Sequence, residues 1–124
     1  MKSIVLLAHG SRDPQWVEPF EAVRAAVERR LPESAVTLAY LDHCPPDFMT
    51  AVDQLVARGA DAIRVVPLFL GAGGHVRVDV PQIVDRVTAR HPAVRFNLKA
   101  FVGDAQEVLD AIADYAVSDS AAPS

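Results

Sequence analysis

The sequence predicts an α/β domain built on a four-stranded, mostly parallel sheet with helices on both faces. Two short apolar runs, residues 4–8 and 63–70, are typical of strands that are covered on both sides. Segments with helical spacing of apolar residues alternate with the strands, so the order β-α occurs four times. Right-handed crossovers then bring the carboxyl ends of all strands to one edge of the sheet, which we call the carboxyl rim.

The first half of the chain contains two strands and one helix. A strand over residues 2–8 is followed by Asp13 and Pro14, which suit the cap and first turn of a helix. One stripe of that helix is formed by apolar residues at steps of three and four, namely Trp16, Phe20, Val23, Val27 and Leu31. Pro32 ends the helix, and residues 35–41 form the next strand.

The second half continues the alternation. A helix following residue 46 ends with Gly59 in the C′ position, and the central strand 63–70 comes next. His75 is then expected in a loop, because Asp79 and Pro81 resemble the cap and early turn of another helix.

The end of the chain predicts an edge strand, a last helix and a tail. Residues 94–100 alternate apolar and polar side chains, which indicates a strand at a sheet edge with one wet face. The last helix carries Val108, Leu109, Ile112 and Ala116. We expect one domain over residues 1–117 and a disordered tail over residues 118–124, which is rich in Ser, Ala and Pro.

Composition excludes several classes of function. The chain has 124 residues, 51% hydrophobic and 23% charged, and a formal charge of −4, which argues against nucleic-acid binding. No apolar run approaches the roughly 20 residues of a membrane span, and no signal peptide is expected. The single cysteine, Cys44, is interpreted as a small loop residue and predicts a cytoplasmic protein.

Histidines gather at the carboxyl rim. His9 and His75 each follow an apolar strand, and imidazole is both a common metal ligand and a base near neutral pH. A single histidine in such a place is more often structural, but two at equivalent positions favour a site. His43 lies on the same rim, whereas His91 on the other rim is expected to be a surface residue.

The sequence does not match the motifs of nucleotide-binding sites or of phosphate-transfer enzymes. The glycines of residues 71–76 lack the glycine that a dinucleotide fingerprint needs where Val76 stands, and no glycine-lysine-serine/threonine triplet is present. The phosphate-transfer histidine enzymes carry arginine directly before the histidine, where this chain has Ala8. A nucleotide site and a phosphatase are therefore disfavoured.

Charged residues accompany the rim histidines. Arg12 and Arg77 could bind carboxylates or phosphates, or remain solvated surface charges. Asp42, at the end of its strand, is a possible metal ligand, histidine partner or cap. Ser11 is interpreted as a turn residue rather than a catalyst.

Two segments together resemble the small class II chelatases. They are residues 8–14, AHGSRDP, and residues 67–81, PLFLGAGGHVRVDVP, within a resemblance covering about residues 3–116. The family includes the sirohydrochlorin cobaltochelatases and ferrochelatases of cobalamin and sirohaem synthesis. It usually has a leucine-glutamate pair at the end of the second strand, where this chain has Leu41 and Asp42.

The resemblance implies a flavodoxin-like, three-layer half-domain and ATP-independent insertion of a divalent metal, Co²⁺, Fe²⁺ or Ni²⁺, into a sirohydrochlorin-type tetrapyrrole. The metal is then a substrate, and no permanent cofactor is expected. By motif, His9 and His75 correspond to the catalytic, metal-handling and proton-accepting pair, with Asp42 as a further metal ligand. The substrate-binding residues are expected to be Arg12, Arg77, Ser11 and Gly74.

The resemblance also implies partners. Larger members contain two such domains facing each other across a cleft, so a chain of this length implies a homodimer. The macrocycle is expected to pack on apolar residues such as Phe69 or Leu70. The rival function is a non-catalytic carrier of metal or tetrapyrrole that uses the same rim.

Overall fold

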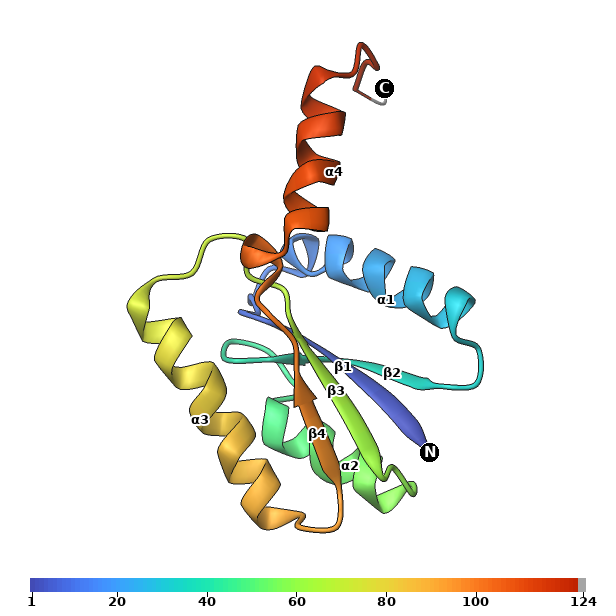
Figure 1. Cartoon of the computed structure of the whole chain (residues 1–124), viewed down its shortest axis with the longest axis vertical. Coiled ribbons are helices and arrows are strands. Elements are labelled where there is room, and N and C mark those ends of the chain that lie inside the picture. Colours follow the sequence, from blue (N-terminus) through green and yellow to red (C-terminus); the bar gives the residue numbers. More distant parts are fainter. Residues whose placement is uncertain (123–124) are drawn as a thin grey trace.

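The computed structural model describes residues 1–122 and contains the predicted sheet (Figure 1). The four strands lie in the order β2-β1-β3-β4, and all three pairings are parallel. The elements in chain order are β1 (Lys2–Ala8), η1 (Pro14–Trp16), α1 (Glu18–Arg30), β2 (Ala35–Tyr40), α2 (Phe48–Ala57), β3 (Ala62–Pro67), α3 (Gly74–Arg90), β4 (Arg95–Leu98), η2 (Val102–Asp104) and α4 (Gln106–Val117). The predicted fold class is confirmed.

Strand burial follows strand position. β1 lies between β2 and β3, and six of its seven residues are buried, as its continuous apolar run predicted. β4 pairs only with β3, and its residues alternate between exposed and half-buried. The prediction of an edge strand with one wet face is therefore confirmed.

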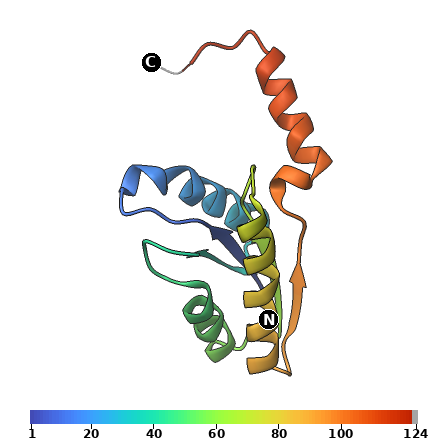
Figure 2. The ribbon, with the colours of Figure 1, turned by 90° about the vertical axis from the view of Figure 1, so that its left-hand side faces the viewer.

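The two faces of the sheet are covered unequally. On one face α2 and α3 enclose the larger core, whose most buried members include Leu7, Val52, Val65, Phe69 and Val80. On the other face α1 alone packs against β1 and β2, and none of its residues is fully buried. Figure 2 shows α2 and α3 on the side of the sheet that α1 does not occupy.

Two helix starts differ from the prediction. α3 begins at Gly74, so His75 lies in its first turn and Asp79 is inside the helix rather than at its N-cap. Pro81 also lies inside the helix, although it lacks the N–H that would bond to the carbonyl of Arg77. The helix continues because Val80, Val84 and Val87 are buried in the core, which offsets the missing hydrogen bond.

Asp13 and Trp16 also lie outside α1. Asp13 caps the short turn η1, accepting a hydrogen bond from the Gln15 amide at 2.9 Å, and α1 follows from Glu18. The side chain of Trp16 is 71% exposed in η1, so its predicted place in the buried helical stripe is wrong.

The last helix does not cover the sheet. α4 rises beyond the carboxyl rim, and none of its residues is buried (Figure 1). Residues 118–122 have no regular secondary structure, and residues 123–124 of the predicted tail lie outside the described residues. Within the described part of the chain, no helix has the length and apolar character needed to cross a bilayer.

An ion-pair cluster joins α2 to the end of α3 on the rim opposite the histidines. Asp53 accepts two hydrogen bonds from Arg90, at 2.9 and 3.0 Å, and lies 2.7 Å from the Nε2 atom of His91. The side chain of His91 is only 17% exposed, so its predicted role as a surface residue is wrong. Arg90 first, and His91 second, lower the pKa of the Asp53 carboxyl.

Asp53→Asn is expected to destabilise the protein by about 1 kcal/mol, because the cluster is partly exposed to water. The melting temperature should fall by about 4 °C at neutral pH. A carboxyl with a lowered folded-state pKa stabilises the fold above its unfolded pKa, about 3.9, and loses that effect as the pH falls through the folded value. Melting curves of both proteins should therefore differ at pH 6 and converge as the pH falls through the lowered pKa of the Asp53 carboxyl. A difference that persists in acid would show that packing, not charge, holds the cluster.

Candidate active site

Backbone hydrogen bonds tie the loop after β1, which carries His9, to the loop after β2, which carries His43. The amide of Asp42 donates to the carbonyl of His9 at 3.0 Å, and the amide of Leu41 donates to Ala8 at 2.9 Å. Gly10 allows this approach, because its φ is +90° and a Cβ there would overlap the Asp42 carbonyl oxygen. The ends of β1 and β2 are therefore one unit that fixes the backbone of His9.

His9 is exposed at this rim but held by an aromatic contact. Its ring meets the ring of Phe69 edge to face, with centroids 4.6 Å apart. Phe69 itself is 1% exposed, so it backs His9 from the core and has no free face for a macrocycle. The expectation that Phe69 packs against substrate is wrong, whereas Leu70 is 57% exposed beside it.

His75 projects from the first turn of α3 and is almost entirely open to solvent. Its side chain is 89% exposed, and its Nε2 atom lies 2.9 Å from a carboxylate oxygen of Asp79, one helical turn further on. A carboxylate in this place orients the imidazole ring. Asp79, which the sequence suggested only as a helix cap, is thus a contact partner of His75.

Asp42 does not face the two histidines as a ligand set. Its carboxylate accepts a hydrogen bond from the His43 amide at 2.8 Å, and the His43 ring lies 4.0 Å away. Among residues 1–122 no three histidine, cysteine, aspartate or glutamate side chains are grouped closely enough to hold a metal. The set of His9, His75 and Asp42 therefore remains a prediction.

The predicted substrate-binding residues differ in whether their polar groups are already hydrogen-bonded within the chain. Arg12 is exposed, and Gly74 opens α3 with free space around it. Ser11 is used locally, since its hydroxyl accepts from the Asp13 amide at 3.0 Å. Arg77 is bound to Asp104 by two hydrogen bonds, at 2.7 and 3.0 Å.

The Arg77 pair connects α3 to the segment before α4. Hydrogen bonds from Arg77 lower the pKa of the Asp104 carboxyl, and Asp104 in turn raises the pKa of the guanidinium. The guanidinium also donates to the carbonyl of Ala72 at 3.2 Å and lies 5.3 Å from the ring centre of Phe101. A substrate carboxylate would have to compete with Asp104 for this arginine.

A hollow of about 340 Å³ lies directly beside His9. Its walls are mostly apolar and include Trp16, Phe20, Tyr40 and Leu68. Burial raises the pKa of the Tyr40 phenol, which therefore stays neutral. The exposed indole of Trp16 also lines a second hollow, shared with Arg12 and His43. Sequence reasoning missed Trp16, because its spacing matched the helical stripe.

Comparison with known proteins gives one consistent result. The CbiX family model matches residues 3–118. The chain is 28% identical over 110 residues to a sirohydrochlorin cobaltochelatase of Priestia megaterium, covering 89% of this chain and 36% of that protein. It is also 28% identical over 111 residues to a sirohydrochlorin ferrochelatase of Bacillus subtilis, covering 90% of this chain and 42% of that protein. The chain thus spans less than half the length of these two relatives.

Solved structures agree with this result. A CbiX protein of Marinobacter aquaeolei VT8 has a TM-score of 0.81 and 34% identity over 94% of both chains. SirB from Bacillus subtilis, solved with Fe³⁺, has a TM-score of 0.76 and 27% identity over 91% of this chain and 45% of SirB. Sequence, length and fold lead to the same conclusion: the chain belongs to the CbiX family.

Proposed function

We propose that this protein inserts Co²⁺ or Fe²⁺ into sirohydrochlorin without ATP, with Ni²⁺ as a further metal to test. The observation that carries the proposal is the presence of two solvent-exposed histidines on the rim of a CbiX-family domain. The named relatives are sirohydrochlorin cobaltochelatases and a ferrochelatase, which supplies the substrate.

The reaction needs groups that bind a metal weakly and accept protons. Insertion of M²⁺ into the macrocycle forms bonds to four nitrogens and releases two pyrrole N–H protons, so the charge balances. Neutral His9 and His75 can each bind the incoming metal or take one of these protons. Few protein ligands are an advantage, because the pyrrole nitrogens must displace them. Asp79 positions His75 for this role.

Substrate binding uses two kinds of surface. The carboxylates of sirohydrochlorin suit the exposed guanidinium of Arg12, and the acidic charge of the whole chain makes such local cations necessary. The apolar faces of the macrocycle suit the exposed side chains of Trp16 and Leu70. Arg77 contributes only if substrate displaces it from Asp104.

We further propose that the active form is a cytoplasmic homodimer. One domain supplies a single wall at its rim, whereas the matched region covers only 36%, 42% and 45% of three longer chains. A second copy can supply the opposite wall. A single free thiol, Cys44, is compatible with a reducing compartment.

Trp16 gives a direct probe of substrate binding, because it is the only tryptophan in the chain. Addition of sirohydrochlorin without metal should quench its fluorescence, since a tetrapyrrole placed beside His9 accepts the excitation energy. Trp16→Leu should raise the Michaelis constant for sirohydrochlorin about tenfold while changing kcat little, because stacking on one face is mostly uniform binding. Unquenched fluorescence at saturating substrate would place the macrocycle elsewhere.

The function itself is tested by anaerobic incubation of sirohydrochlorin with Co²⁺, Fe²⁺ or Ni²⁺, with and without protein, followed by visible spectroscopy. A chelatase accelerates the spectral change and forms many metallated molecules per chain. A carrier of metal or tetrapyrrole would give tight stoichiometric binding and no turnover. A rate equal to that of the protein-free reaction for all three metals would refute the proposal.

A further inference from the structure

A groove leads from His9 toward the loop that follows β2. The hollow of about 340 Å³ beside His9, here the inner hollow, shares Ser11, Val17 and Tyr40 with an outer hollow of about 630 Å³. The outer hollow reaches Cys44, whose Sγ atom accepts a hydrogen bond from the Ser11 amide at 3.4 Å. This bond links the loop after β1 to the loop after β2. The two hollows therefore keep a fixed position relative to each other and form one groove.

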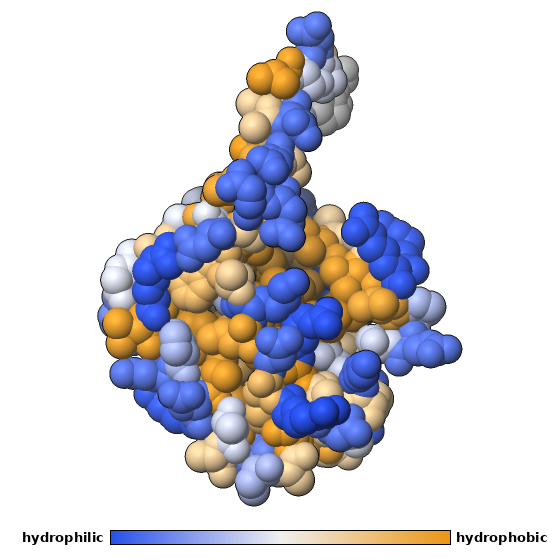
Figure 3. Space-filling model, viewed as in Figure 1, coloured by the Kyte–Doolittle hydropathy of each residue, from blue (hydrophilic) through white to orange (hydrophobic). Residues whose placement is uncertain are grey.

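Tyr40 lies in the wall between the two hollows and carries a hydroxyl without a partner. It is the last residue of β2 and is only 4% exposed, and its hydroxyl makes no hydrogen bond within residues 1–122. The hydroxyl still reaches solvent, because Ser3 carries the only unpaired side-chain atom in those residues that is completely enclosed. By contrast Tyr115, the other tyrosine, is 71% exposed on α4, which stands clear of the body (Figure 3). A buried hydroxyl without a partner destabilises a fold, so phenylalanine would suit position 40 better unless the hydroxyl meets a ligand.

The phenol end of Tyr40 belongs to the outer hollow. Burial, followed by the charges of Cys44 and Glu21, raises the pKa of the phenol, and both of these residues line the outer hollow. At neutral pH the phenol therefore keeps its proton and can donate one hydrogen bond. A carboxylate is the acceptor that gains most from such a donor.

The charges of the outer hollow nearly cancel. Among the described residues that line it, Arg12 is the one arginine or lysine, and Glu18 and Glu21 are the carboxylates. Glu21 is already paired with Arg24 at 2.7 Å, which leaves Arg12 and Glu18 to oppose each other. Charge alone would therefore hold an anion weakly here, and a neutral donor such as a phenol decides whether a carboxylate binds.

We propose that the outer hollow receives one carboxylate side chain of the tetrapyrrole, with the Tyr40 hydroxyl donating a hydrogen bond to it and Arg12 pairing with its charge. The macrocycle itself lies beside His9 and Trp16, so this arm fixes its rotation in its own plane. Tyr40 is then a specificity-determining residue, because a site built to hydrogen-bond a polar group rejects analogues that lack the group. The inference rests on the proposed function and adds a substrate contact to it.

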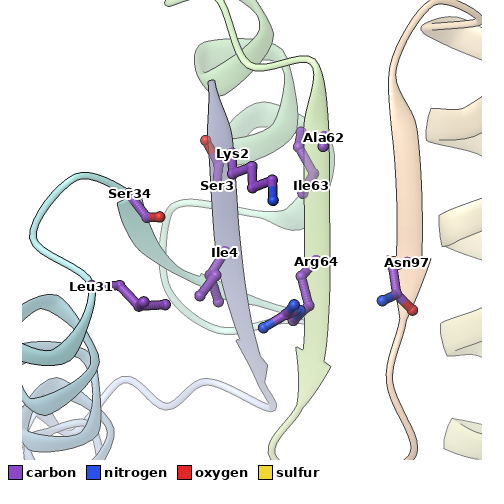
Figure 4. A pocket seen from close by; sticks show the side chains of 9 residues that line it. All are labelled: Lys2, Ser3, Ile4, Leu31, Ser34, Ala62, Ile63, Arg64 and Asn97. Atoms are coloured by element: carbon purple, nitrogen blue, oxygen red, sulfur yellow. The ribbon is translucent and has the colours of Figure 1, made fainter.

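A third hollow, of about 310 Å³, provides a comparison (Figure 4). It lies at the amino ends of the strands, and its walls include Lys2 and Arg64, both exposed. His9 follows the carboxyl end of β1, so this hollow is at the opposite end of the parallel sheet. Arg64 therefore serves as a control for unspecific attraction between an acidic substrate and an exposed cation.

The first test compares the two tyrosines by equilibrium dialysis against metal-free sirohydrochlorin. Tyr40→Phe should raise the dissociation constant about tenfold or more, because one hydrogen bond to a charged group is lost. Its melting temperature should stay the same or rise slightly, since the hydroxyl has no partner in the fold. Tyr115→Phe removes the same atom from α4 and should leave the dissociation constant unchanged.

Three results of this test would overturn the proposal. One is an unchanged dissociation constant for Tyr40→Phe. Another is a melting temperature that falls by several degrees in this variant, because the hydroxyl would then serve the fold. The third is an equal loss of affinity in Arg12→Gln and Arg64→Gln, since we expect weaker binding only for Arg12→Gln.

Methyl-esterified sirohydrochlorin shows whether the hydroxyl meets a carboxylate. The ester keeps the macrocycle but loses its negative charges, so the tenfold difference between the parent protein and Tyr40→Phe should shrink to about threefold or less. Acid and ester are compared in the same dilute detergent. An equal factor for both would place another part of the macrocycle against Tyr40 and contradict the proposal.

Protection of Cys44 locates the arm directly. Cys44 is the only cysteine of the chain, is free and lines the outer hollow, so iodoacetamide reports on this hollow alone. Saturating metal-free sirohydrochlorin should slow alkylation about tenfold or more, as followed by mass spectrometry. Equal rates with and without sirohydrochlorin would place the arm outside the outer hollow.

These binding measurements do not depend on metal insertion. A protein that binds sirohydrochlorin through Tyr40 but forms no metallated product would remove the proposed function and leave this contact. Metal insertion with an unchanged Michaelis constant in Tyr40→Phe would remove the contact and leave the proposed function.

Discussion

Replacing His9 or His75 with alanine is expected to lower kcat for metal insertion by about 100-fold or more, the usual effect of losing a general base. Neither change should cost much stability. His75 is 89% exposed, and removal of His9 loses mainly its edge contact with Phe69, worth about 1 kcal/mol. The measurements are initial rates by visible spectroscopy and melting temperatures of the same preparations.

His91→Gln is the control for these variants. His91 lies at the end of α3 on the opposite rim and is bonded to Asp53, so its loss should affect stability but not turnover. Full activity in a folded His75→Ala protein would show that the rim histidines are surface residues without a catalytic role.

Gly10→Ala is expected to destabilise the protein strongly, although the residue lies outside the core. The residue has a φ of +90°, and an added Cβ would overlap the Asp42 carbonyl and touch the Cβ of Tyr40. Strain and overpacking together should cost about 3 kcal/mol, a fall of roughly 10 °C in melting temperature. Activity of the folded fraction should also fall, because the His9 loop must separate from the Asp42 loop.

Gly59→Ala separates the effect of backbone strain from the effect of overpacking. Gly59 also has a positive φ, +101°, but a Cβ there has nothing within 4 Å. It should cost about 1 kcal/mol from backbone strain alone and leave the rate of metal insertion unchanged. If both alanine variants behaved alike, close packing between the rim loops would not matter for the site.

The sequence predicted the sheet well because its signals were local. The continuous apolar run of β1 and the alternation of β4 are direct consequences of burial on two faces and on one. The role of Gly59 just past the end of α2 was equally predictable, because a positive φ after a helix favours glycine.

The errors came from residues whose roles depend on distant contacts. Asp79 and Pro81 have the composition of a helix start, but α3 begins at Gly74, which makes Asp79 a partner of His75 one turn earlier. Trp16 fits a helical spacing, yet it stands on a separate turn beside His9. Arg77 looked free, because nothing local indicates its pair with Asp104, 27 residues away. The course of α4 was also unpredictable, because its apolar stripe indicates a helix but not the direction in which that helix runs.

The most direct test of metal insertion at this rim is the number of products formed per chain under anaerobic conditions. The parent protein and the double variant His9→Ala/His75→Ala are incubated with sirohydrochlorin and Co²⁺, both in large excess over protein. We predict many metallated tetrapyrroles per parent chain, and a rate no higher than the protein-free reaction for the double variant, which should still be folded and still quench Trp16 on binding. A parent protein that stops at one product per chain, or a double variant that keeps turning over, would contradict the account.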